Sequence, residues 1–272
     1  MNSVAAKKFF GAGIVFATLV SFAQDTPSTT PRFISLERAI VLAAASPSDK
    51  GFPAIVNEDV VVQLNKMLTQ SWSRKSLKKA LDRLEELKPM LQEESNLEQT
   101  PWELMAIAFV ESNFRNPTQS ANRWKSAGLW QFTRNSGRAH GLKVTAKKGE
   151  RLDMQKATRA ALRYLKRNRE DLGNWPLAIL GYNVGPAKVK KIMDAMSSDD
   201  AFEIVKSGPL GGDPEYLAKV MASVIILKNP SLLDLKDGAP ELPMLSSEPS
   251  IPNEPPRLIP PRFVERSGRH LN

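Results

Sequence analysis

The sequence predicts an all-α protein. Apolar residues recur every three or four positions in most segments between residues 36 and 228, a spacing typical of helices that pack on a core. No segment of convincing length alternates between apolar and polar residues, as a half-buried strand would. The chain of 272 residues is 42% hydrophobic and 25% charged, which is enough to bury one sizeable core.

The first 23 residues have the pattern of a secretory signal peptide. Lys7 and Lys8 precede an apolar stretch, Phe9 to Phe22, and small residues stand before a cleavage site that we expect after Ala23. An uncleaved membrane anchor is the alternative, although the apolar stretch is shorter than the roughly 20 residues of a full span. We therefore expect export to the periplasm or cell envelope, with no stable membrane anchor after cleavage.

Two segments precede the principal domain. Residues 24–51 are expected to form a linker and a short helix, Leu36 to Ala45. Residues 52–99 are expected to form an N-terminal helical extension. In this extension a helix from Ser76 to Leu87 should end where Pro89 breaks it, and a short helix should follow.

The principal domain, residues 100–233, is organised around its first helix. Thr100 is the expected cap, with Glu103 three positions later, and seven apolar residues from Leu104 to Val110 lead to Glu111. A helix that is apolar on all sides is buried, so Glu111 would lie at the edge of the core. Desolvation and the negative end of the helix dipole should raise its pKa and allow general acid chemistry. A solvated residue after a buried helix is the simpler interpretation of this segment alone.

The composition excludes several classes of chemistry. Cysteine is absent, and His140 and His270 are the only histidines, so thiol catalysis and cysteine metal sites are excluded and a histidine-rich metal site is poorly supported. We expect no metal and no cofactor. The formal net charge of +9 suggests an anionic partner, but the sequence has no nucleic-acid-binding motif, so we expect no nucleic acid.

Further motifs follow in the same domain. In Gly128-Leu129-Trp130-Gln131, glycine permits close backbone approach, and an amide between large apolar residues is typical of a sugar subsite. A short buried segment with one satisfied glutamine is the alternative. Asp153 should cap a helix that contains Tyr164, and a later apolar helix ends in Gly181-Tyr182-Asn183. Tyr216 stands at the start of the last helix. Residues 234–272 form a Pro-rich segment that we expect to be a disordered tail.

Taken in order, the Glu111-Ser112 pair, the Gly128 to Gln131 motif, the Tyr182-Asn183 motif and the Tyr216 helix resemble the soluble lytic transglycosylase family. The pattern is most similar to the D-type membrane-bound lytic murein transglycosylases and covers residues 52–233. The resemblance implies a lysozyme-like, goose-lysozyme-related helical domain with Glu111 as its single catalytic acid and base. It also implies substrate-binding residues, which are Ser112, Gln131, Tyr182 and Asn183, with Tyr164 and Tyr216 as weaker candidates.

The same resemblance implies a reaction and a substrate. The substrate would be the glycan strands of peptidoglycan, cleaved at the MurNAc–GlcNAc β-1,4 bond with formation of 1,6-anhydromuramoyl ends. Most glycosidases need two carboxylates, and the sequence offers no second acid in a comparable setting. The basic outer face of the helix after Asp153 would suit an acidic glycan. The alternatives are a muramidase similar to goose-type lysozyme, which hydrolyses the bond, and a peptidoglycan-binding scaffold without turnover.

Overall fold

The computed structural model describes residues 34–234, apart from 46–47, 49, 120–124, 145–148 and 209, and omits the side chains of residues 71 and 72. The expected signal peptide and Pro-rich tail lie outside the described residues. Within the described part, the chain forms ten α-helices and three 3-10 helices, and no strand beyond one isolated bridge between Ala127 and Phe132. The all-α prediction is confirmed. None of these helices is long and apolar enough to cross a membrane.

The helices follow the chain in a simple order. The α-helices are α1 (Leu36–Ala44), α2 (Glu58–Thr69), α3 (Ser71–Leu97), α4 (Met105–Ser112), α5 (Arg134–Ala139), α6 (Met154–Leu172), α7 (Trp175–Val184), α8 (Pro186–Met196), α9 (Ala201–Lys206) and α10 (Tyr216–Lys228). The 3-10 helices are η1 (Trp102–Leu104), η2 (Glu150–Leu152) and η3 (Pro230–Asp234).

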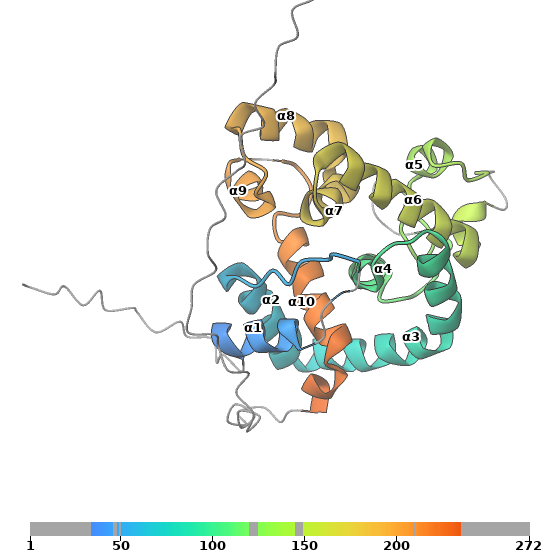
Figure 1. Cartoon of the computed structure of the whole chain (residues 1–272). Coiled ribbons are helices and arrows are strands. Elements are labelled where there is room, and N and C mark those ends of the chain that lie inside the picture. Colours follow the sequence, from blue (N-terminus) through green and yellow to red (C-terminus); the bar gives the residue numbers. More distant parts are fainter. Residues whose placement is uncertain are drawn as a thin grey trace, which may run out of the picture. The chain divides into compact units, whose positions relative to one another are not determined.

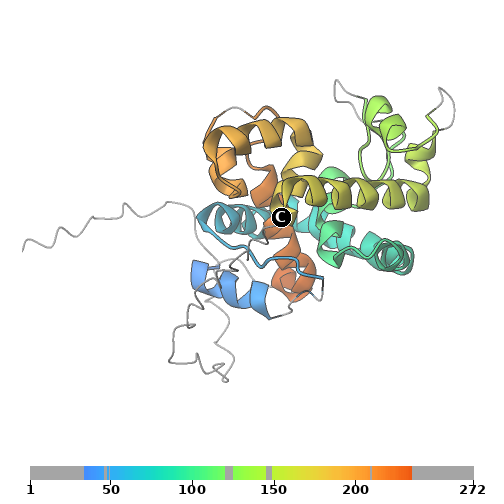
Figure 2. The same cartoon turned by 45° about the horizontal axis from the view of Figure 1, so that its top comes forward.

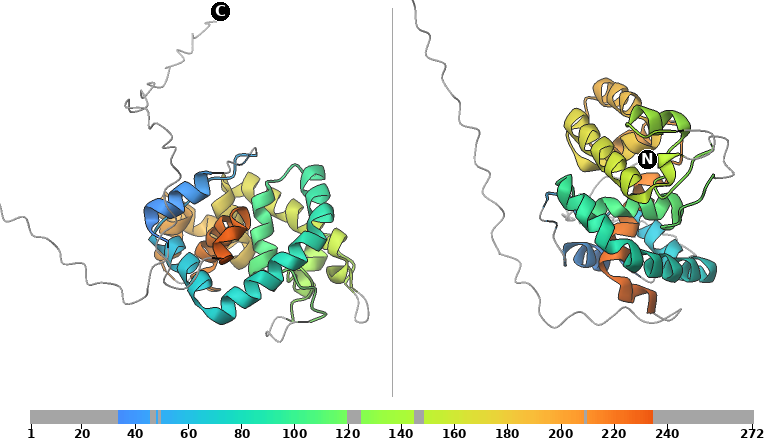
Figure 3. Two further views of the ribbon diagram at one scale, coloured as in Figure 1. Left: turned by 90° about the horizontal axis from the view of Figure 1, so that it is seen from below. Right: turned by 90° about the vertical axis from the view of Figure 1, so that its right-hand side faces the viewer.

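Helix α10 lies at the centre of the packing. Ten of its 13 residues are buried, and it contacts α1, α2, α4 and α7. Figure 3 shows it in orange with the first four helices around it. A helix apolar on nearly all sides has to be enclosed by others, and this enclosure brings the end of α4 beside the start of α10.

Helix α6 connects the two sides of the described structure. It packs against α7 and α8 on one side and against α3 on the other. In Figure 2 it runs from the centre of the view to the right, in yellow-green, with α7, α8 and α9 grouped above and to its left. The start of α6 agrees with the sequence analysis, because Asp153 accepts a backbone hydrogen bond from the first turn; Ser35 and Asn57 do the same for α1 and α2.

The predicted break at Pro89 is wrong. Helix α3 is continuous over 27 residues with Pro89 inside it, although Figure 1 shows that the helix changes direction in its last third. Proline removes the bond to the carbonyl of Glu85, but both residues are exposed, so solvent can satisfy that oxygen. The proline therefore bends the helix without ending it.

The predicted cap at Thr100 is also wrong. The chain enters α4 through the 3-10 helix η1, which has no side-chain cap, and the Thr100 hydroxyl instead donates to the Ser95 carbonyl at 3.4 Å. Glu103 is buried and forms an ion pair with Lys228 at 2.8 Å. This carboxylate therefore links η1 to α10. Leaving a buried charge without a partner would cost more free energy than leaving the helix start without a cap.

Candidate active site

Glu111 is held at the last turn of a buried helix. In α4, every residue except Val110 and Glu111 is buried, so the apolar helix places the carboxyl at the edge of the core as predicted. The hydroxyl of Tyr216, from the first turn of α10, donates a hydrogen bond of 2.8 Å to Oε1. Burial raises the pKa of Glu111 to about 7, against the opposing effect of the Tyr216 hydrogen bond. The carboxyl can therefore hold a transferable proton near neutral pH.

Glu111 opens into a cavity of about 620 Å³. The described residues that line it are Glu111, Ser126, Gln131, Phe132, Thr133, Ser136, Tyr164, Tyr182, Asn183, Val184, Gly185, Lys188, Leu210, Gly211 and Gly212. Among them Glu111 is the only acid. A concave site of this size with a few polar groups and aromatic rings is typical of a small-ligand or sugar site.

The turn from Gly128 to Gln131 forms one wall of this site. Gly128 has a φ of +81°, and a Cβ added to it would overlap the carbonyl oxygen of Arg151. The predicted close backbone approach is therefore confirmed, since no other residue fits here. Gln131 also has a positive φ, +50°, and its Nε2 donates to the Gly128 carbonyl at 2.8 Å. Such backbone geometry in a non-glycine residue persists only where neighbours impose it.

Side chains from other elements hold the carbonyl groups of this turn. The Ser112 hydroxyl donates to Leu129 O at 2.8 Å, and the Tyr182 hydroxyl donates to Trp130 O at 2.7 Å. Just after the turn, the Phe132 carbonyl accepts a hydrogen bond of 2.9 Å from Arg151 of η2. Motifs that are separate in the sequence thus meet at one turn, which fixes the position of the Gln131 backbone beside Glu111.

The predicted site residues divide into two groups. Five of them line the cavity, namely Glu111, Gln131, Tyr164, Tyr182 and Asn183. Ser112 and Tyr216 are not among the lining residues; both are buried, Ser112 against the turn and Tyr216 against Glu111. Their geometry supports positioning of the site more directly than contact with a ligand.

Aromatic rings form a second wall. Tyr164 stacks on His140 with ring centroids 3.8 Å apart, and its ring centroid lies 5.5 Å from that of Tyr182. The Tyr164 hydroxyl donates to the Gly181 carbonyl at 3.1 Å. Burial and the neighbouring Arg167 charge lower the pKa of His140 and favour its neutral form. On this side the cavity is therefore lined by the ring faces of Tyr164 and Tyr182, whose hydroxyl groups already donate to backbone carbonyls.

The sequence analysis missed several lining residues, chiefly Ser126, Thr133, Ser136 and Lys188. Thr133 and Ser136 form a capping box at the start of α5, a helix that the sequence analysis did not anticipate. Their spacing could have indicated that helix start. No local sequence signal distinguished Lys188, because it is one of several lysines on α8.

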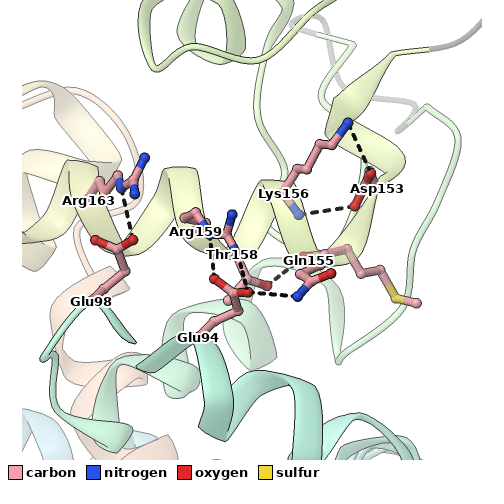
Figure 4. Close-up of polar contacts among 9 residues, drawn as sticks. Glu94, Glu98, Asp153, Gln155, Lys156, Thr158, Arg159 and Arg163 are labelled. Atoms are coloured by element: carbon pink, nitrogen blue, oxygen red, sulfur yellow. Dashed lines mark hydrogen bonds and ion pairs between the residues drawn. The ribbon is translucent and has the colours of Figure 1, made fainter. Parts of the chain in front are cut away.

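No basic residue of α6 is among the described residues that line the cavity, and two of its arginines are paired with acids at the end of α3. Arg159 makes two hydrogen bonds to Glu94, at 2.8 and 2.7 Å, and Arg163 pairs with Glu98 at 2.9 Å. Figure 4 shows these contacts bridging α6 and the end of α3, with Lys156 beside Asp153. The paired guanidinium groups of Arg159 and Arg163 join α6 to the end of α3, and their charge is largely neutralised by Glu94 and Glu98.

Metal ligation finds no support among the described residues, which contain no group of three or more His, Cys, Asp or Glu side chains placed to hold an ion. The polar groups of the described lining residues are instead a single carboxyl, amides, hydroxyls and one ammonium group. This set is suited to proton transfer and hydrogen bonding.

The helical fold and this one-acid cavity agree with a comparison to known families: residues 88–205 match the model of the transglycosylase SLT domain. This part of the chain is therefore similar to transglycosylase SLT domains. The match begins inside α3 and ends in α9, so α10 with Tyr216 lies beyond it.

Curated relatives point to the same class. Membrane-bound lytic murein transglycosylase D of Escherichia coli strain K12 is 35% identical over 132 residues, which is 47% of this chain and 28% of that protein. The protein of the same name from E. coli O6:H1 matches to the same extent. The matched region thus spans just over a quarter of the length of these relatives.

Proposed function

We propose that this protein is a lytic transglycosylase that cleaves the β-1,4 bond between N-acetylmuramic acid and N-acetylglucosamine in peptidoglycan. The observation that carries the proposal is the lone carboxyl of Glu111, with a pKa of about 7, in a cavity whose described lining has no second acid. The match to SLT domains and the murein transglycosylase relatives support the same activity.

In this reaction, one group serves first as acid and then as base. The protonated Glu111 carboxyl donates its proton to the bridging oxygen as the bond from that oxygen to the muramyl C1 breaks. The carboxylate then accepts the proton of the muramyl C6 hydroxyl while O6 attacks C1. The product is a 1,6-anhydromuramoyl end, no water is consumed, and Glu111 is protonated again.

Neighbouring side chains would orient the sugar. Oδ1 of Asn183 is buried and has no hydrogen-bond partner among the described residues, so its amide is available to an N-acetyl group. The Tyr182 hydroxyl is already engaged with Trp130 O, which leaves its ring as the contact surface. Gln131 and Tyr164 line the same cavity and complete the candidate subsite.

Digestion of purified murein tests the proposal. Mass spectrometry should find anhydromuramoyl products, each lighter by one water than the hydrolytic product of the same fragment. Reducing ends would instead assign the muramidase activity of goose-type lysozymes. Binding to murein without any product would assign a scaffold.

We also propose that the protein acts in the cell envelope after export, on the evidence of the basic and apolar pattern of residues 1–23. The N-terminal sequence of the mature protein should begin at Gln24. Recovery of intact Met1 from the membrane fraction would contradict cleavage and favour an anchor.

A further inference from the structure

One cation at the edge of the cavity has no role in the reaction described above. Lys188 lies in the first turn of α8, lines the cavity and is exposed. Among the described residues, its ammonium group has neither an ion-pair partner nor a hydrogen-bond acceptor. Lys190, two positions further on, instead lies 4.0 Å from Asp194 on the outer side of the helix.

The ammonium group of Lys188 lies close to the loop formed by residues 210–212, which we call the rim loop. A Cβ added to Gly211 would lie 3.1 Å from Nζ. All three rim-loop residues line the same cavity as Lys188. The positive charge therefore lies at the cavity edge, between α8 and the rim loop.

The helix that carries Lys188 adds only its dipole to this charge, because Pro186 has no N–H and the Lys188 N–H donates to the Gly185 carbonyl at 3.2 Å. The start of α8 at Gly185 has no side-chain cap, and Gly185 also lines the cavity. Helix N-termini carry partial positive charge, which makes a lysine in the first turn unfavourable unless an anion lies nearby. Because Glu111 is the only acid among the described lining residues, the protein itself supplies little compensation.

We propose that Lys188, at the cavity edge beside the rim loop, forms a subsite for a carboxylate of the substrate. This inference rests on the proposed function, and it makes carboxylate-bearing glycan strands the preferred substrates over neutral ones. The carboxylate has two possible sources in murein. One is the peptide stem, and the other is the lactyl group of muramic acid where the stem has been removed.

Binding measurements test this subsite apart from turnover. In a Glu111→Gln background, dissociation constants would be measured for three probes: murein strands with stems, the same strands after amidase removal of the stems, and chitin oligosaccharides of similar length. Lys188→Gln should weaken binding of a carboxylate-bearing probe by about three- to tenfold at low salt, and less at high salt. Binding of chitin should not change.

Two further variants serve as controls. Lys188→Arg keeps the charge and should retain binding, whereas Lys191→Gln removes an exposed charge of the same helix outside the cavity lining and should have no effect. An effect on stem-bearing strands alone assigns the peptide carboxylates, and an effect on stripped strands assigns the lactyl group.

Two results would overturn the inference. In the first, Lys188→Gln binds every probe as tightly as its parent does. In the second, Lys188→Gln weakens the binding of chitin as much as that of the carboxylate-bearing probes. The proposed function has a separate test, because it fails if protein with Glu111 intact releases no anhydro product from murein. Strand binding that depends on Lys188 would remain measurable in that case.

Discussion

The hydroxyl of Tyr216 donates a hydrogen bond of 2.8 Å to Oε1 of Glu111, joining two side chains 105 positions apart in the sequence. Tyr216 is buried, and both burial and the nearby Glu111 carboxyl raise its own pKa well above its usual value, so it stays a donor. Its hydrogen bond favours the carboxylate form of Glu111, while burial favours the acid form. The two effects together leave a carboxyl that can both give and take a proton near pH 7.

Replacement of Glu111 by Gln should abolish release of anhydromuramoyl products. The amide has the same size and polarity but carries no transferable proton, and general acid–base catalysis typically contributes about 10²–10⁴-fold. Here one group serves both steps, so the loss should reach at least the upper end of that range. Product release and a thermal melt would be measured together. Retained activity in a normally folded variant would place the acid elsewhere.

The same variant should change the pH dependence of stability. Because the folded-state pKa of Glu111 is raised from 4.5 to about 7, the charged carboxylate costs folding free energy. This cost is absent below pH 4.5, grows between the two values and is complete above about pH 7. Glu111→Gln should therefore unfold like the parent at low pH and be more stable at pH 8, by about 3 kcal/mol at most. If the variant and the parent had identical denaturation curves at pH 8, the Glu111 carboxyl would not be desolvated in the folded protein.

The activity of the parent should fall as the pH rises through about 7, because the protonated form of Glu111 starts the reaction. Tyr216→Phe removes the hydrogen bond that lowers this pKa, so the alkaline limb of the pH profile should move to higher pH. The pH dependence of kcat/KM for a soluble murein fragment measures the shift. A limb that stays in place, or moves to lower pH, would show that Tyr216 does not tune the acid.

A pair of glycine variants tests the turn beside Glu111. Gly128 and Gly141 have nearly the same φ, +81° and +83°, but only a Cβ at Gly128 meets another atom, the Arg151 carbonyl oxygen. Gly141→Ala should cost about 1–2 kcal/mol for the left-handed backbone. Gly128→Ala should cost at least about 2 kcal/mol more and reduce murein cleavage, because the turn has to move. Equal melting temperatures for the two variants would mean that the turn adapts without strain.

Local signals in the sequence were sufficient for most of the helices. Apolar spacing and the caps Ser35, Asn57 and Asp153 act over only a few residues, so they can be interpreted without the fold. The seven apolar residues before Glu111 likewise indicated a buried helix and a desolvated acid, and burial of α4 accounts for the raised pKa.

Long-range packing decided the rest. Whether Pro89 ends a helix depends on solvent access to one carbonyl, and whether Glu103 caps a helix depends on the presence of Lys228. The roles of Ser112 and Tyr216 also follow from which groups the packed helices bring within hydrogen-bond distance. Periodicity and capping describe each segment alone, whereas these contacts join residues far apart in the chain, so only the tertiary structure determines them.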